Sequence, residues 1–234
     1  MTCIYIDPGH GGSDPGAVGS QSKEKDINLA VAKLVSAGLQ ARGIDAPLTR
    51  TGDTRLSESA NTDLNLRVLA ANNRKADYFI SIHCNANAGP SGTGTETYVY
   101  GYGGKAEKLA HSVQSEVVKA IGLANRGVKT GNFAVIRDTR MPAILIEMGF
   151  INNPSDEAIL LSRQHDFAQA IVNGVLGYLG MQKEEGAIVE KEISVERARR
   201  IIIDKAGLSP ETVQYLWSYR YGDELLKKLA AAIE

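Results

Sequence analysis

The sequence predicts an α/β protein with a mostly parallel, twisted sheet and helices on both faces, followed by a small all-helical C-terminal domain. Short apolar runs alternate with segments in which apolar residues recur every three or four positions, and this alternation is typical of βαβ units. The runs are almost continuously apolar, as expected for parallel strands that helices bury on both faces. The pattern ends at residue 180, where a charged stretch follows.

The composition is that of an ordinary globular protein without a strong overall charge. The chain has 234 residues, of which 43% are hydrophobic and 23% charged, and its formal net charge is -1. This length suits one medium domain with a small appendage. The charge provides no general attraction for nucleic acid, so we expect no nucleic-acid partner. No stretch reaches the about 18 apolar residues that span a bilayer, so we expect no membrane insertion.

The first half of the chain alternates strands and helices around one polar loop. The patterns predict strands at 3–6, 44–49 and 78–83, helices at 24–39 and 64–71, and a loop over 50–62. In the helix that begins at Glu24, Ile27, Val31 and Leu34 belong to a single apolar stripe. Gly43 follows this helix and is a typical stop signal.

The second half continues the alternation and then changes character. We expect strands at 95–100, 133–136 and 143–146, and helices at 106–121, 154–157 and 167–179. The main domain is therefore expected to span 1–180, with a charged linker at 181–191 and a small domain at 192–234. In this small domain we expect three short helices at 195–205, 210–219 and 223–233. Ser209 before Pro210 matches the residues preferred at a helix start.

Two of the four histidines lie at the ends of predicted strands, since His10 comes just after the first strand and His83 is the last residue of the strand at 78–83. In open α/β sheets, binding sites form outside the carboxyl ends of the strands, so these two imidazoles are candidates for a site. Taken alone, His10 fits an ordinary residue of the turn Pro8–Gly12 as well as it fits a functional residue. The other histidines, His111 and His165, lie on predicted helices and are expected to face solvent.

Glu24 begins the first predicted helix and is expected beside the His10 turn. A carboxylate at that position also interacts favourably with the helix dipole. Glu24 could therefore stabilise the helix without binding any metal. Together with His10 and His83 it forms a His₂Glu set, which is a common catalytic zinc arrangement with an open position for water. Neighbouring residues in a strand point to opposite faces, so Cys84 is not expected to reach the same metal as His83.

Glu147 ends an almost entirely apolar run, Ala143–Ile146. An acidic residue is rarely buried without a partner, so its position at a strand end suggests a function. Beside a metal, this carboxylate can take a proton from water and pass it to a leaving group, as hydrolysis of an amide requires. The alternatives are that Glu147 is a fourth metal ligand or a member of a structural ion pair.

Four segments in this order resemble the zinc-dependent N-acetylmuramoyl-L-alanine amidases of the type-3 amidase family. They are Asp7–Gly12 (DPGHGG), Glu24–Leu29 (EKDINL), Ser81–Ala86 (SIHCNA) and Pro142–Asn153 (PAILIEMGFINN). The resemblance runs from about residue 2 to residue 180, and the four motifs in register make it specific. It departs from the family at Cys84, where a small residue is more common.

The resemblance implies a function and a role for each candidate residue. His10, Glu24 and His83 would bind Zn²⁺, and Glu147 would be the catalytic acid/base. The substrate would be peptidoglycan, cut between the lactyl group of muramic acid and the first alanine of the peptide stem. Asn132 lies in another segment that resembles the family near the cleft, without an assigned role.

The N-terminal sequence contains no recognisable signal peptide, which leads to an expectation about location. The protein would be made in the cytoplasm of a bacterial host and act on the cell wall after release, as a bacteriophage endolysin does. The C-terminal domain would bind cell wall or mediate self-association. Its aromatic residues would stack on sugars or, as we favour for most of them, form a small core; they are Tyr215, Trp217, Tyr219 and Tyr221.

Two other functions are compatible with parts of the pattern. A catalytically inactive wall-binding protein would need no metal-activated water, so the complete set of His10, Glu24, His83 and Glu147 disfavours it. A zinc peptidase that cuts within the peptide stem would use the same residues, and only the family resemblance separates it from an amidase.

Overall fold

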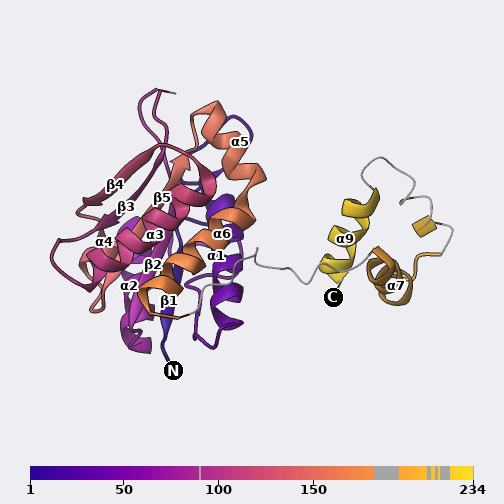
Figure 1. The fold of residues 1–234 in the computed structure, drawn as a ribbon, viewed down its shortest axis with the longest axis horizontal. Coiled ribbons are helices and arrows are strands. Elements are labelled where there is room, and N and C mark those ends of the chain that lie inside the picture. The colour runs from indigo at the N-terminus through magenta and orange to yellow at the C-terminus, as the bar shows by residue number, and fades with distance from the viewer. Residues whose placement is uncertain (90, 182–194, 210–211, 214–215, 217–221, 234) are drawn as a thin grey trace. The chain divides into compact units, whose positions relative to one another are not determined.

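The computed structural model describes residues 1–234 with the exception of 90, 182–194, 210–211, 214–215, 217–221 and 234. The chain divides into two compact units, which comprise residues 1–188 and 189–234 (Figure 1). The first unit contains every segment that resembles the amidases, so the sheet and its helices are described first.

The sheet of the first unit has five strands within the described residues, in the order β1-β2-β5-β3-β4. The strands are β1 (Ile4–Pro8), β2 (Tyr78–Asn85), β3 (Thr95–Val99), β4 (Asn125–Thr130) and β5 (Ala143–Phe150). The pairs β1/β2, β2/β5 and β3/β4 are parallel, whereas β3 and β5 are antiparallel. The prediction of a mostly parallel sheet is therefore confirmed.

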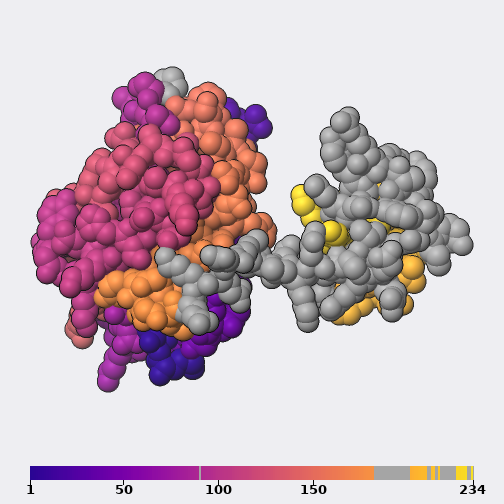
Figure 2. Space-filling view, viewed as in Figure 1, coloured from indigo at the N-terminus to yellow at the C-terminus, as the bar shows by residue number. Residues whose placement is uncertain are grey.

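Helices lie on both faces of this sheet, which also confirms the prediction. They are α1 (Glu24–Gln40), α2 (Ala60–Arg74), α3 (Lys105–Ile121), α4 (Ala134–Arg137), α5 (Pro154–Ser162) and α6 (Gln164–Tyr178). On one face α6 packs between α1 and α3, and on the other α2 packs with α4. In the space-filling view, the atoms of α3 and α6 lie side by side over the near face (Figure 2).

The alternation of side chains along β2 separates a large core from a small one. Ile80, Ile82 and Cys84 belong to the large core, which includes apolar residues of α1, α3 and α6. Phe79 belongs to the small core with Val68 of α2. His83 is four residues after Phe79 and shares its face, so the candidate site lies on the side of the sheet with the smaller helical cover.

The predicted strand at 44–49 is wrong as a regular strand. In the structure this segment makes only isolated bridges, Cys3 with Asp45 and Ile6 with Leu48. Pro47 explains the difference, because proline has no N–H to donate and cannot take part in a continuous ladder. Its carbonyl still accepts a hydrogen bond of 2.9 Å from the N–H of Ile6, so the segment lies along β1.

Three other elements also differ from the sequence prediction: one in its start, one in its type, and one that was not predicted. The loop expected over 50–62 ends earlier, because α2 begins at Ala60 with Ser59 as its N-cap, whose side chain accepts from the N–H of Thr62. The segment expected as a strand at 133–136 belongs instead to the single-turn helix α4 and its N-cap residue, Phe133. Strand β4 was missed because it is largely polar, with no fully buried residue, and lies at the sheet edge.

The second unit is described only in part. Its helices α7 (Val195–Ala206) and α9 (Gly222–Ile233) match two predicted helices, and Ile202, Val213, Leu226 and Ala230 form a small core. Ser209 caps the intervening segment, since its hydroxyl accepts from the N–H of Thr212 at 3.2 Å. Most of the helix predicted at 210–219, linker residues 182–191 and the aromatic residues Tyr215, Trp217, Tyr219 and Tyr221 lie outside the described residues.

In the part of the chain that the structure describes, no helix has the length and apolar character needed to cross a membrane. Both cysteines, Cys3 and Cys84, are described and are free thiols. Cys84 is buried in the large core with its Sγ 3.5 Å from Oδ1 of Asn28, which confirms that its side chain points away from the face of His83.

Candidate metal centre and active site

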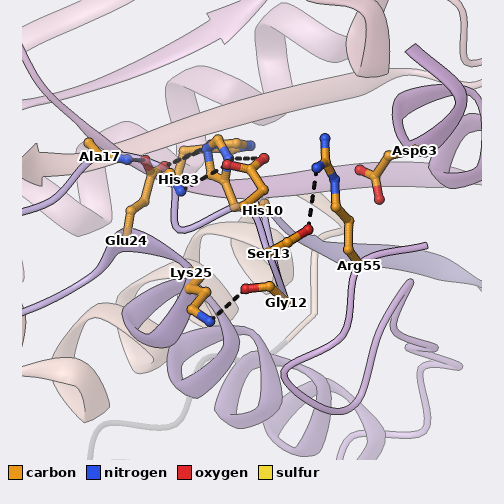
Figure 3. Close-up of polar contacts among 12 residues, drawn as sticks. His10, Gly12, Ser13, Ala17, Glu24, Lys25, Arg55, Asp63 and His83 are labelled. Atoms are coloured by element: carbon orange, nitrogen blue, oxygen red, sulfur yellow. Dashed lines mark hydrogen bonds and ion pairs between the residues drawn. The ribbon is translucent and has the colours of Figure 1, made fainter. Parts of the chain in front are cut away.

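Three side chains from separate elements converge beyond the carboxyl end of β1. His10 follows β1, Glu24 is the first residue of α1, and His83 lies near the end of β2. Each offers one potential ligand atom, and these atoms all lie within 4.8 Å of one another. Figure 3 shows the three side chains pointing toward one another. The structure thus brings together the three residues that the sequence predicted as metal ligands.

One carboxylate oxygen lies between the two imidazoles. Oε1 of Glu24 is 3.3 Å from Nε2 of His10 and 2.9 Å from Nδ1 of His83. The imidazole rings meet edge to face, with their centroids 5.0 Å apart. The backbone fixes this carboxylate from two sides, because Oε2 accepts from the N–H of Ala17 at 2.8 Å and Oε1 from that of Cys84 at 3.0 Å.

A second acidic residue, Asp14, orients His10 from its other side. Oδ2 of Asp14 lies 2.9 Å from Nδ1 of His10, which leaves Nε2 directed at Glu24. Burial opposes protonation of His10, but the two carboxylates outweigh it and raise the pKa of His10 to about 9. Burial likewise opposes ionisation of Glu24, but the two histidines hold the pKa of Glu24 well below its usual range. Both shifts favour the charged forms, with His10 as a cation and Glu24 as an anion.

Glycines allow this close approach. A Cβ atom on Gly9 would lie 2.1 Å from Cε1 of His83, and one on Gly16 would lie 2.6 Å from Oε2 of Glu24. Any other residue at these positions would displace a candidate ligand. His10 itself has φ of 62°, a conformation that few residues other than glycine adopt.

Two buried arginines hold the backbone of this strained turn. Arg50 donates from Nε to the carbonyl of Pro8 and from Nη2 to that of Gly9, each at 3.0 Å. Arg67 donates to the carbonyls of Pro8 and His10, each at 2.8 Å. These contacts bind consecutive carbonyl groups and so fix the direction in which the His10 side chain leaves the turn.

Carboxylates neutralise Arg67 inside the protein. Its Nη1 lies 2.8 Å from Oδ1 of Asp7, and its Nε lies 2.7 Å from Oδ2 of Asp63. Burial opposes ionisation of Asp7, but Arg67 and the hydroxyl groups of Thr49 and Ser81 together hold its pKa below the usual value. The network therefore joins β1, α2 and β2 directly beneath the candidate ligands.

Glu147 of β5 lies in one row with His83 and Glu96, because it is the register partner of both across neighbouring strands. It is not part of the His10–Glu24–His83 group. Its Oε2 atom is buried and has no hydrogen-bond partner in the described part of the chain. Burial, followed by the negative charges of Glu24 and Glu96, raises its pKa well above the usual value. The structure thus places an unsatisfied acid beside a candidate metal ligand.

Glu96 stays ionised beside Glu147 because cations surround it. Nε of Arg126 lies 2.7 Å from its Oε2, and Lys129 contacts the same oxygen. The hydroxyl of Tyr98 donates to its Oε1 at 2.9 Å. Although burial opposes ionisation, these contacts hold the pKa of Glu96 below its usual value.

The loop that leads into Glu24 is anchored by Glu157 of α5. Oε1 of Glu157 accepts from the N–H of Gln21 at 2.8 Å and from the hydroxyl of Ser22 at 2.7 Å. Its Oε2 accepts from both the N–H and the hydroxyl of Ser20. Because the loop ends at the first residue of α1, this carboxylate positions the start of the helix that carries Glu24.

Replacing Glu157 with glutamine is expected to destabilise the protein by about 1–3 kcal/mol, because an amide NH₂ would face the donors of Ser20. The affinity for zinc should fall as well, since the loop before Glu24 loses its anchor. Chemical denaturation and a competitive zinc titration measure the two effects. Glu107→Gln is the matched control, because the Glu107 carboxylate accepts from the Gly103 N–H at 2.6 Å on another helix. Equal effects of both substitutions would contradict the anchoring role.

A cleft of about 160 Å³ opens onto the candidate ligands. His10 and His83 line it together with Arg55, Leu64 of α2 and Val135 of α4, whereas Glu147 does not. Larger hollows of about 350 and 460 Å³ lie between α3 and α6 and between α3 and β4, and they contain none of the predicted site residues. His111 and His165 are exposed, as expected.

The residues that support the site were not predicted as functional from the sequence; they are Asp7, Asp14, Arg50, Arg67 and Glu157. Asp14 had a signal, because it follows His10 by four residues in a turn. The two arginines had none, since a charged residue in a loop or helix is usually exposed.

Known proteins resemble the first unit in sequence and in structure. The family model for N-acetylmuramoyl-L-alanine amidase matches residues 4–177. The chain is 42% identical over 178 residues to the uncharacterized protein YqiI of Bacillus subtilis, covering 75% of this chain and 84% of that protein. It is also 42% identical to the sporulation-specific N-acetylmuramoyl-L-alanine amidase of the same organism, covering 74% of this chain and 65% of that protein.

A solved structure gives the same result for the fold. The catalytic domain of CwlV, an N-acetylmuramoyl-L-alanine amidase from Bacillus (Paenibacillus) polymyxa var. colistinus, is 38% identical and superposes with a TM-score of 0.71. The match covers 78% of this chain and 100% of that domain. With the fold, the converging residues and these matches in agreement, the chain belongs to the N-acetylmuramoyl-L-alanine amidase family.

Proposed function

We propose that this amidase hydrolyses the bond between the lactyl group of N-acetylmuramic acid and the first L-alanine of peptidoglycan, with Zn²⁺ held by His10, Glu24 and His83. The observation that carries the proposal is the convergence of these three ligand groups within 4.8 Å beside the cleft. Family membership supports peptidoglycan as the substrate.

The residues present fit a zinc ion in number and chemistry. Two imidazoles and one carboxylate are ligands that zinc accepts in catalytic sites, where a fourth position stays open. Asp14 supports His10 through its second ring nitrogen, as partners of metal-bound histidines commonly do.

In this site, the zinc ion would make water more acidic and polarise the carbonyl of the scissile amide. Glu147 takes the proton of the attacking water on a carboxylate oxygen and delivers it to the amide nitrogen of the departing alanine. The unpartnered Oε2 atom suits this exchange, because no described group of the protein competes for it. Asp14 keeps the proton of His10 on Nδ1 throughout.

Removal of zinc is expected to abolish hydrolysis of purified peptidoglycan, and stoichiometric zinc should restore it. Glu24→Gln should lose most of its zinc affinity, because one ligand loses its charge. Metal content and release of soluble fragments measure both expectations. Undiminished hydrolysis by a protein shown to be free of metal would contradict the proposed metal centre.

The cellular role extends this proposal. That the protein acts as a bacteriophage endolysin, which lyses its host from within, stays a prediction. That it is made in the host cytoplasm and then released stays a prediction as well. The named relatives are bacterial, and one of them is described as sporulation-specific. For residues 192–234 we keep the proposal of cell-wall binding or self-association. Deleting them should lower binding to isolated cell walls while leaving hydrolysis of small soluble substrates intact.

A further inference from the structure

We propose that Arg55 forms a carboxylate subsite in the cleft, which binds the free α-carboxylate of the second residue of the peptide stem. The inference rests on the proposed amidase function and adds a preference to it. In peptidoglycan, the residue after the first alanine carries an α-carboxyl group that is either free or amidated. Arg55 would favour the free form.

The position of Arg55 is fixed beside the candidate metal ligands. It lines the same cleft as His10 and His83, and its side chain is only 16% exposed. Its backbone lies against the glycine turn, since a Cβ on Gly12 would come within 2.8 Å of the Arg55 nitrogen. Figure 3 shows the Arg55 side chain next to Ser13 and Asp63, with its guanidinium group directed away from its backbone.

Charge pairing distinguishes Arg55 from the other charged residues of the cleft. Asp7 and Asp63 are both paired with Arg67 at 2.8 Å or less. Asp14 contacts His10 at 2.9 Å. Each of these groups therefore already has a close partner of opposite charge within the protein.

Arg55 has only loose contacts among the described residues. Its Nη1 lies 3.5 Å from Oγ of Ser13 and 4.0 Å from Oε2 of Glu58, whose side chain is 85% exposed. Its Nε has no acceptor in the described part of the chain although it is shielded from solvent. Its charge also acts on Asp14, which is already paired with His10. The guanidinium group is thus the charged group of this cleft that lacks a close partner of its own, and it is placed to bind an anion.

The size of the cleft indicates which anion can reach it. A volume of about 160 Å³ is small compared with the roughly 300–1,000 Å³ of typical ligand pockets. Arg55 lines the cleft together with the candidate ligands His10 and His83, so an anion bound there lies close to the proposed reaction centre. The carboxyl group of the first alanine is consumed in the next peptide bond, so the second stem residue is the first to offer a free carboxylate.

The chemistry of arginine explains the expected preference. A guanidinium group binds a carboxylate through charge-assisted hydrogen bonds, often two at once. An amidated carboxyl group has no charge and offers one acceptor oxygen together with two donors, which arginine cannot accept. The unamidated stem should therefore bind better, whereas the zinc ligands and Glu147 act on either stem.

The test uses two synthetic N-acetylmuramoyl dipeptides that differ only in a free or an amidated α-carboxyl group on the second residue. We expect the full-length zinc-loaded protein to cleave both, with kcat/KM about tenfold or more higher for the free carboxylate. Arg55→Gln should remove this preference, mainly by raising KM for the free form. Arg55→Lys should keep part of it, because a charge remains without the planar fork.

Arg140→Gln is the matched control, since it removes the same charge from an exposed residue outside the cleft lining and should keep the preference. Equal kcat/KM values of the wild-type protein for both substrates would overturn the inference while leaving the amidase function in place. An equal loss on both substrates in Arg55→Gln would overturn it as well. If neither substrate is cut at the lactyl–alanine bond, the proposed function itself is wrong.

Discussion

Glu147→Gln is expected to lower kcat for peptidoglycan hydrolysis by about 10²–10⁴-fold, because an amide cannot accept the proton of the attacking water. The bound zinc should stay, since Glu147 is not one of the three convergent ligands. The amide has nearly the shape of the acid, so the buried site should keep its packing. Steady-state kinetics together with metal analysis of the purified variant measure both parts of the expectation.

The same experiment separates the two alternatives for Glu147. A fourth ligand would lose zinc affinity together with activity, and a structural ion pair would show mainly as lost stability. Glu107→Gln provides the control for a glutamate replaced on the surface of α3, and it should retain full activity. A Glu147→Gln variant as active as the wild-type protein would contradict the assignment of Glu147 as the acid/base.

Arg67→Met is expected to have the largest effect on stability, lowering the free energy of unfolding by about 3–5 kcal/mol. The substitution leaves the carboxylate of the buried Asp7 without its cation and removes a donor from the carbonyl of His10. Zinc affinity should fall too, because the turn that directs His10 loses its support. The unfolding measurement belongs in metal-free protein, so that zinc binding does not contribute.

Arg74→Met is the matched control for this substitution. Arg74 lies on the same helix, and its Nη2 pairs with Oδ2 of Asp45 at 2.7 Å, but its side chain is 55% exposed. A surface pair of this kind contributes little to stability, because water screens the two charges. Circular dichroism is the suitable probe, because the single tryptophan, Trp217, lies outside residues 1–188. Equal destabilisation by both substitutions would contradict the role given to the buried network.

The parts of the fold that the sequence predicted are those buried by apolar residues. The runs around Ile4 and Ile80 and the stripe of α1 have periods that follow from burial on one or two faces, so pattern and structure agree. The prediction was wrong at 44–49, where Pro47 interrupts a buried run, and at two segments where the apolar pattern does not identify the element. Strand β4 is polar because it lies at an edge, and the run at 133–136 was too short to distinguish a strand from the helical turn α4.

In the candidate site, the sequence likewise predicted some residues and not others. His10, His83 and Glu147 stand out in the sequence because each ends or follows an apolar strand, where sites form in open α/β sheets. Glu24 stands out because it begins the helix next to the His10 turn. The residues that hold these four side chains in place do not stand out in the sequence. Arg67 becomes informative only when its contacts with Asp7 and the carbonyl of His10 are seen, and these residues are far apart in the chain.

The central claim, a zinc amidase that cuts between muramic acid and L-alanine, is tested most directly by mass analysis of digested peptidoglycan. We expect intact stem peptides with a free N-terminal L-alanine, together with glycan chains that retain their lactyl groups. Chelation of the metal should stop their release, and added zinc should restore it. Cuts within the stem peptide would instead make the protein a zinc peptidase, and the same products from metal-free protein would contradict the metal-dependent mechanism.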